Sequence, residues 1–343
     1  MQLLPLPPQP SDAHWPTQEW PTGALRTADQ PAFDALVAEA FAAKDTPTLG
    51  ETHALLVVQH GRMVFERYGE GFDAASTHHS WSMAKSITQA LIGMLVKDGK
   101  LDIHTAADVP AWANDERAAI TLDQLLRMSS GLKFVEDYAP NGGPSDVIAM
   151  LFNEGKEDVA AFAAAQPLHH KPGAYWSYAS GTTNIVSRIA ARALGSYGDD
   201  FKRFMTERLF APLGIRSAIP RFDKAGTFIG SSYCFMTARD FARFGLLYLR
   251  DGVWDRRRLL PEGWVDYART PTFQQAGVTD NRYGAHWWLD FAGPGSFSAN
   301  GYDGQFIILA PDRDLIIVRH GVTPLAVKEN LKTWVAKLAA SLA

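Results

Sequence analysis

The sequence predicts an α/β (α+β) protein in which one antiparallel sheet, flanked by helices, is built from both ends of the chain. Apolar strand-like runs lie within residues 54–68 and 284–319, whereas residues 101–250 are mostly helical in pattern. The simplest assembly packs a shared sheet against helices and inserts a helical lobe between its two halves. The expected units are an extended arm at 1–27, an α/β lobe from 28–104 plus 251–343, and a mostly helical lobe at 105–250.

The composition is that of a soluble globular protein with a large core. The chain has 343 residues, of which 46% are hydrophobic and 20% charged. The net charge of -4 is spread along the chain, so nucleic acid and anionic membranes are not expected as partners. The single cysteine, Cys234, excludes an internal disulfide. No basic leader and no long apolar run are seen, so the cytoplasm is the expected location.

The first elements follow from periodicity and turn residues. Residues 1–27 are rich in proline and polar side chains, which favours an extended arm. Apolar residues at helical spacing predict a helix over 31–43. Two strand-like runs, 54–59 and 63–68, flank His60-Gly61-Arg62, which is typical of a hairpin turn.

The remaining elements are mostly helices, followed by strands near the end of the chain. A strongly apolar helix is expected to begin at Ser82 and to end near Gly99, which can supply a left-handed cap. Further helices are predicted at 122–128, 145–152, 158–165, 182–194, 201–209 and 238–250. The last segment predicts strands at 284–291, 305–310 and 315–319 and a closing helix at 326–340.

The segment Ser82-Met83-Ala84-Lys85 is the first candidate for chemistry. Residues three apart on a helix share one face, so the Lys85 amine can reach the Ser82 hydroxyl. A serine becomes a good nucleophile when a base removes its proton, and a partly desolvated lysine can do this. The alternative is a serine that caps the helix, followed by a solvated lysine. The segment therefore indicates a catalytic site only together with other motifs.

Two later segments are such motifs. The run Trp176-Ser177-Tyr178-Ala179-Ser180-Gly181 leads into a predicted helix and can place the Tyr178 phenol at its N-terminus as a general acid or base. The run Asn300-Gly301-Tyr302 precedes an apolar strand, and glycine there permits close approach of a ligand to the backbone. A packed aromatic side chain and an ordinary turn are the respective alternatives.

Together the three segments resemble the serine β-lactamase and penicillin-binding protein superfamily. That superfamily has S-x-x-K at the head of a helix, then Y-x-[NS], then a glycine-containing strand motif near the C-terminus. The resemblance covers residues 54–321 and is greatest to the branch of class C β-lactamases, esterases and 6-aminohexanoate-dimer hydrolases. It implies a β-lactamase/transpeptidase-like fold and a serine hydrolase that needs no cofactor or metal. The sequence segments at 97–102, 120–131 and 283–288 also resemble this family.

The resemblance also implies roles for individual residues. Ser82 would be the acylated nucleophile, Lys85 would take or relay its proton, and Tyr178 would be the partner base and would protonate the leaving group. The backbone N–H groups of Ser82 and Tyr302 would form the oxyanion hole. A lysine with its ordinary pKa of about 10.4 is charged near neutrality, so the choice of acylation base between Lys85 and Tyr178 stays open.

The third segment differs from the strongest form of the family motif. β-Lactamases carry Lys-Thr-Gly there and many related esterases His-Thr-Gly, whereas this chain has Ala299-Asn300-Gly301. The missing cation normally engages the carboxylate of penicillins and cell-wall peptides. The expected substrate is therefore a small ester or amide, with β-lactamase or peptidase activity as an alternative and a non-catalytic binding module as another. Asn300 and Gly301 are expected to contact the substrate.

Three more residues are weaker candidates for the substrate site. Asp146, or nearby Asp137, could contact a substrate amine, although a solvated surface carboxylate is the alternative for both. Trp287 is expected to line the site. The adjacent histidines at 78–79 and 169–170 lack the spacing of zinc ligands, so no metal is expected. The oligomeric state does not follow from the sequence.

Overall fold

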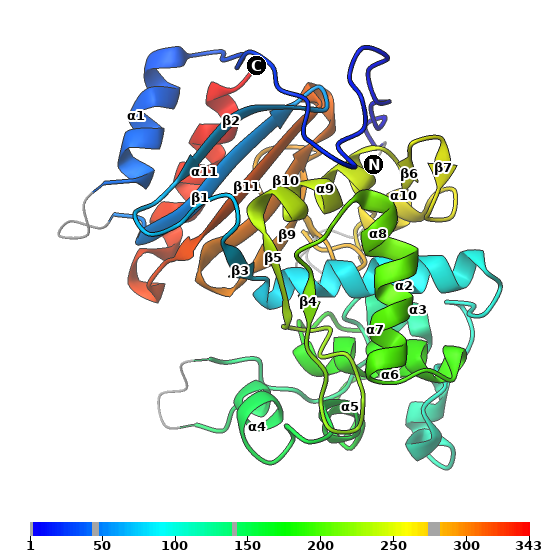
Figure 1. Cartoon of the computed structure of the whole chain (residues 1–343). Coiled ribbons are helices and arrows are strands. Elements are labelled where there is room, and N and C mark those ends of the chain that lie inside the picture. The colour runs from blue at the N-terminus through cyan, green and yellow to red at the C-terminus, as the bar shows by residue number, and fades with distance from the viewer. Residues whose placement is uncertain (1–2, 43–47, 139–142, 274–281) are drawn as a thin grey trace.

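The computed structural model describes residues 3–42, 48–138, 143–273 and 282–343. It contains a six-stranded antiparallel sheet in the order β2-β1-β11-β10-β9-β8, so strands from both ends of the chain lie side by side (Figure 1). The predicted fold class is confirmed. The strands of this sheet are β1 Glu51–Gln59, β2 Arg62–Tyr68, β8 Trp288–Leu289, β9 Phe297–Gly301, β10 Gln305–Ala310 and β11 Leu315–Val322.

The sheet is covered by helices on both faces. On one face, α1 (Gln30–Ala40) and α11 (Lys328–Ser341) pack on alternate strand residues such as Leu55 and Val57. The intervening Leu56 and Val58 face the other side, where α9 (Ala238–Leu249) contributes Phe241 and Phe244 to the larger core. Because both faces are buried, the central strands carry long apolar runs, and every residue of β10 is buried.

One of the helices between β2 and β8 is buried over most of its length. That helix is α2 (Ala84–Lys97), in which every residue from Ala84 to Leu95 is buried, as expected for a helix that is enclosed on all sides. Its neighbour α6 (Ser180–Leu194) also contacts α3 and α5. The other helices are α3 Leu122–Leu126, α4 Asp146–Phe152, α5 Val159–Ala164, α7 Asp199–Met205, α8 Ala211–Leu213 and α10 Trp264–Ala268.

Short elements complete the chain. The strands β3 Thr77–His79, β5 Cys234–Thr237 and β4 Ile219–Pro220 form a three-stranded sheet, and β6 Val253–Trp254 pairs with β7 Arg257–Arg258. Single helical turns are η1 Trp81–Met83, η2 Pro110–Trp112, η3 Glu116–Ala119, η4 Thr206–Phe210, η5 Tyr302–Gly304, η6 Pro311–Arg313 and η7 Leu325–Val327. Within the described residues, none of the helices has both the length and the apolarity needed to cross a bilayer.

Two strand predictions need correction. The run 284–291 was expected to be one strand, but only Trp288–Leu289 pairs, because the chain turns at His286 and Asp290, where φ is +59° and +56°. The strand β9 was not among the predicted strands, since Asn300-Gly301-Tyr302 was expected only to precede one, with an ordinary turn as the alternative. Pairing with β10 on one side and β8 on the other makes it a strand.

The N-terminal arm is held by two arginines of the α9 region. Residues 3–21 form no helix or strand and run beside α9 and the β6–β7 hairpin (Figure 1). Arg250 donates hydrogen bonds to the Pro7 carbonyl and to Gln9, and Arg243 donates to the Pro16 carbonyl. The arm is therefore part of the folded structure. The proposed division into two lobes stays a prediction.

Candidate active site

The nucleophile candidate lies in a tight turn between β3 and α2. Ser82 belongs to the single turn Trp81–Met83, and α2 begins only at Ala84, two residues later than predicted. Trp81, directly before Ser82, has φ of +44°, which is rare for a bulky side chain. Such backbone strain persists only where the surroundings impose it, and it is common at functional sites.

Lys85 is buried beneath this turn, with 1% of its surface exposed. Its Nζ donates to Ser82 Oγ, Ser180 Oγ and the Ser231 carbonyl, each at 3.0 Å. These three bonds use every hydrogen of an ammonium group. Burial lowers the pKa of Lys85 to about 8, against an opposing effect of Glu136. The alternative of a serine cap with a solvated lysine is thereby wrong.

The Tyr178 side chain lies over the same amine. Lys85 Nζ is 4.8 Å from the centre of the Tyr178 ring. Burial raises the pKa of Tyr178 well above 10, Tyr283 and Glu136 raise it further, and a hydrogen bond with Ser82 opposes the rise. The phenol therefore keeps its proton near neutral pH. The structure brings Ser82, Lys85 and Tyr178, predicted from three separate motifs, into one group.

Two members of this group were not identified from the sequence. Glu136 Oε2 accepts a hydrogen bond from the Ser180 backbone N–H at 2.7 Å, and Oε1 accepts one from the Ser180 hydroxyl at 2.6 Å. Burial raises the pKa of Glu136, while Lys85 and the Ser180 donors lower it. Ser180 is the last residue of the Y-x-[NS] motif that begins at Tyr178, but no role was predicted for it. Glu136 stands beside Asp137 in a charged loop segment, and nothing in the sequence distinguishes the half-buried carboxylate from the exposed one.

The glycine motif forms the other side of the site. A Cβ at Gly301 would lie 2.4 Å from the Ser80 carbonyl oxygen, so only glycine lets the end of β9 approach the turn that carries Ser82. Tyr302 follows directly, and its ring lies 5.5 Å from that of Trp81 and 4.9 Å from that of Tyr138. This proximity agrees with the expected oxyanion role of the Tyr302 N–H, which stays a prediction.

Asn300 is half-buried beside Gly301 in β9. Its Oδ1 is buried and accepts no hydrogen bond from any described residue. An unpartnered buried amide oxygen costs free energy unless a ligand or water satisfies it. The expected contact of Asn300 and Gly301 with substrate stays a prediction, and their position next to the Ser82 turn is compatible with it.

The expectation for Trp287 is corrected. Its side chain is fully buried, with its ring 4.5 Å from Tyr248 and 5.2 Å from Phe297, so it belongs to the core. The next residue, Trp288, is half-buried and lies 5.3 Å from the Tyr178 ring. Adjacent residues of an extended chain point to opposite sides, so only one of the two can reach the site. The sequence does not show which one.

The acidic candidates have different surroundings. Asp146 is in the first turn of α4, where its Oδ2 accepts from the Val135 N–H at 2.7 Å, so it has a structural partner. Asp137 is exposed, and its carbonyl accepts from the Ser145 hydroxyl. In the part of the chain that the structure describes, no three histidine, cysteine or acidic side chains are grouped as metal ligands.

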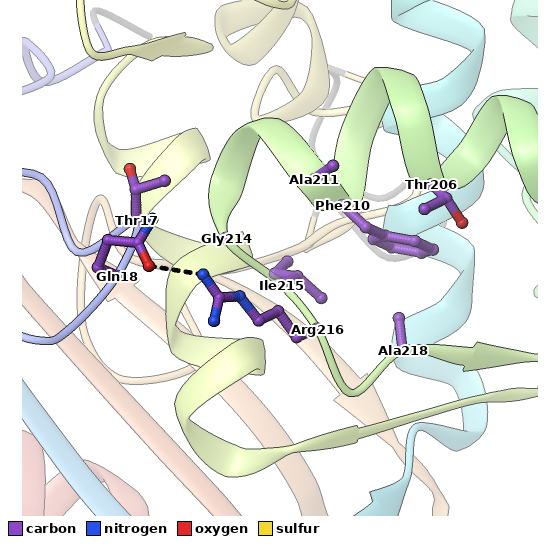
Figure 2. Close-up of a pocket in the computed structure, with 9 residues that line it drawn as sticks. All are labelled: Thr17, Gln18, Thr206, Phe210, Ala211, Gly214, Ile215, Arg216 and Ala218. Carbon is purple, nitrogen blue, oxygen red and sulfur yellow. Dashed lines mark hydrogen bonds between the residues drawn. The ribbon is translucent and has the colours of Figure 1, made fainter.

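A separate pocket of about 480 Å³ lies elsewhere. It is formed where the arm residues Thr17 and Gln18 meet Phe210, Ile215 and Arg216 (Figure 2). Arg216 donates a hydrogen bond to Gln18 Oε1 within it. The lining contains no nucleophile paired with a base. This pocket is therefore a weaker candidate for an active site than the group around Ser82.

Comparison with known proteins agrees with the geometry. A 6-aminohexanoate-dimer hydrolase from Paenarthrobacter ureafaciens is 25% identical and aligns with 78% of this chain and 72% of its own. A Bacillus anthracis protein described as a 6-aminohexanoate-dimer hydrolase has a TM-score of 0.75 at 22% identity, over 94% of this chain and 89% of its own. A family VIII carboxylesterase has a TM-score of 0.66 at 15% identity, over 93% of this chain and 98% of its own.

The family itself is settled by a match that spans most of the sequence. The sequence model of the Beta-lactamase family matches residues 33–321. That range contains all three segments from which the resemblance was inferred, and it begins in α1 and ends in β11. The chain therefore belongs to the beta-lactamase family, within the superfamily of serine hydrolases that includes the penicillin-binding proteins.

Proposed function

We propose that this protein hydrolyses small esters or amides through an acyl-enzyme formed on Ser82. The observation that carries this proposal is the buried Lys85 amine, which lies 3.0 Å from Ser82 Oγ and has a lowered pKa. A hydroxyl beside a lysine that can become neutral is an activated nucleophile. The names of the relatives, a dimer hydrolase and a carboxylesterase, support the same reaction class.

Lys85 is the better candidate for the acylation base. With a pKa of about 8, about one tenth of the amine is neutral at pH 7, whereas Tyr178 stays protonated. The neutral amine takes the Ser82 proton as Oγ attacks the substrate carbonyl. The carbonyl oxygen gains negative charge, which the N–H groups of Ser82 and Tyr302 would stabilise by on the order of 3 kcal/mol each.

Tyr178 is suited to act as the general acid, which donates a proton to the leaving group. Its pKa is raised well above 10, so the phenol has a proton to give to the departing alcohol or amine. Lys85, protonated in the first step, would be the nearby group from which the phenolate regains a proton, with Nζ 4.8 Å from the ring centre. Water then attacks the acyl group, and the same groups act in reverse order to release Ser82.

The surroundings of Ser82 favour a substrate whose chain is apolar next to the scissile bond. Ala299 occupies the position where penicillin-recognising relatives have a cation, and it is buried in β9. Two groups of aromatic rings lie near Ser82: Trp81, Tyr138 and Tyr302 form one group, and Tyr178 and Trp288 form another. Such rings supply large apolar contact area. A carboxylesterase substrate and the hexanoyl chain of a 6-aminohexanoate dimer both have such an apolar part next to the scissile bond.

Labelling read by intact mass tests the proposal. A fluorophosphonate should add one adduct to the wild-type protein and none to the Ser82→Ala variant, and p-nitrophenyl esters should be turned over only by the wild type. A stable penicillin adduct at Ser82 would instead favour a penicillin-recognising enzyme. If the phosphonate does not label Ser82 and no ester is hydrolysed, a binding module on the same fold replaces the proposed hydrolase.

A further inference from the structure

We propose that Glu136 is a positioning residue that acts through the Ser180 hydroxyl to direct the Lys85 amine at Ser82. This inference rests on the proposed hydrolase function and adds a residue to its proton path. The three side chains Glu136, Ser180 and Lys85 form one hydrogen-bonded chain that ends at Ser82 Oγ.

The direction of each hydrogen bond follows from Glu136. Both of its oxygens accept from Ser180, Oε2 from the backbone N–H at 2.7 Å and Oε1 from the hydroxyl at 2.6 Å. A carboxylate is held well by such paired donors, and the N–H is at the first residue of the fifteen-residue helix α6, where negative charge is favoured. The Tyr138 phenol is also a hydrogen-bond partner of Glu136 and of Ser180, but a carboxylate is a stronger acceptor than a phenol, so the single hydrogen of the Ser180 hydroxyl is directed to Glu136.

The direction of the Ser180 hydrogen bond determines whether Lys85 presents a hydrogen or its lone pair to Ser82. With its hydrogen turned to Glu136, Ser180 Oγ presents only lone pairs to Lys85 Nζ at 3.0 Å, and the Ser231 carbonyl is an acceptor by nature. A neutral amine has two hydrogens and one lone pair. These two acceptors take both hydrogens, so the lone pair is left for the third partner, Ser82 Oγ. The Ser82 hydroxyl must then donate, as acylation requires.

The charge of Glu136 also matters after the proton moves. In acylation the proton passes from Ser82 Oγ to Lys85 Nζ, the Oγ–carbon bond forms, and the carbonyl π electrons move to its oxygen. The resulting ammonium donates to all three acceptors, and the carboxylate behind Ser180 stabilises its charge. Glu136 itself gains and loses no proton. Among the described residues, the other titratable groups that face Lys85 are Tyr178 and His286, and neither brings a negative charge near neutral pH.

A purely structural role is the competing explanation, because Glu136 also satisfies the N–H at the start of α6. The two roles differ in what they change. Loss of a structural anchor lowers stability but leaves the pKa that governs activity in place. Loss of the negative charge near Lys85 makes the ammonium less favourable, so the lysine pKa must fall.

The test measures kcat, KM and the pH profile of the full-length enzyme with a p-nitrophenyl ester. Glu136→Gln should lower the plateau kcat by about 10²-fold, the lower range of general acid–base effects, with KM unchanged. It should also move the acidic limb of kcat/KM to lower pH. Glu136→Asp, which keeps the charge, should keep that limb close to its wild-type position and recover part of kcat.

Ser180→Ala isolates the hydroxyl. It removes the hydrogen bond to Lys85 but keeps the backbone N–H that Glu136 accepts, so it should lose kcat to a similar extent. The double variant Glu136→Gln/Ser180→Ala should be no slower than the slower single variant, because both changes break the same chain. The matched control is Asp223→Asn, whose carboxylate also accepts backbone N–H groups, from Val159 and Thr227, away from Lys85. It should lower stability without moving the pH limb.

The outcomes separate this inference from the function on which it rests. Wild-type kcat and an unmoved limb in folded Glu136→Gln, or full activity in Ser180→Ala, would overturn the positioning role while the phosphonate still labels Ser82. If Glu136→Gln does not fold, Ser180→Ala decides alone. A wild-type protein that neither hydrolyses the ester nor takes the label would overturn the hydrolase proposal and this inference with it.

Discussion

Replacing Gly301 by alanine should disable the oxyanion hole while leaving Ser82, Lys85 and Tyr178 in place. The new Cβ would lie 2.4 Å from the Ser80 carbonyl oxygen, whereas ordinary van der Waals contact begins near 3.4 Å. The obstacle is a backbone atom, so it cannot swing aside as a side chain would. Either β9 or the turn must move by about 1 Å, a shift large enough to break hydrogen bonds that hold only from 2.7 to 3.1 Å.

The displaced group is the Tyr302 N–H, which follows Gly301 directly. Removing one oxyanion donor typically lowers kcat by 10²–10³-fold, so a loss of about that size is expected with the p-nitrophenyl ester. Gly143→Ala is the matched control, because a Cβ there meets nothing within 4 Å. It should keep wild-type kcat. A folded Gly301→Ala enzyme with unchanged kcat, verified by circular dichroism and Tm, would refute the assignment of the oxyanion hole to this strand end.

Four further expectations follow from the structure. Ser82→Ala should abolish ester turnover with little change in Tm, and Tyr178→Phe should lower kcat by about 10²-fold; near-wild-type rates would remove the residue concerned from its proposed role. The kcat/KM profile should rise with pH through about 8 as Lys85 loses its proton; a profile flat from pH 6 to 9 would contradict Lys85 as the base. Burial lowers the pKa of His78 to about 4, so its contribution to stability is complete above about pH 6.5 and is lost as pH falls toward 4. Between pH 7 and 5 this loss is about 2 kcal/mol in the free energy of unfolding. Urea unfolding of the wild type and of His78→Gln at both pH values measures it, and an equal pH dependence in the two proteins would contradict it.

The features that the sequence determined are those set by neighbours along the chain. The hairpin at His60-Gly61 forms where predicted, with both residues at positive φ, because two-residue turns of this kind match the twist of the strands. The three-residue spacing of Ser82 and Lys85 places their side chains together because one turn of helix does so in any context. The apolar runs of β10 and β11 identify central strands for the same local reason.

The remaining features were decided by which distant segments pack together. The residues of β9 look like a turn, and they become a strand only because β10 and β8 supply hydrogen-bond partners. Trp287 and Trp288 are equivalent in sequence, and packing alone buries the first and leaves the second beside Tyr178. In the sequence Glu136 is one acidic residue among many. Only the fold brings it against Ser180 at the start of α6 and close to Lys85 of α2, where the two charges interact. Burial depends on the whole fold, so the motif residues could be named in advance, whereas the environment that makes them reactive could not.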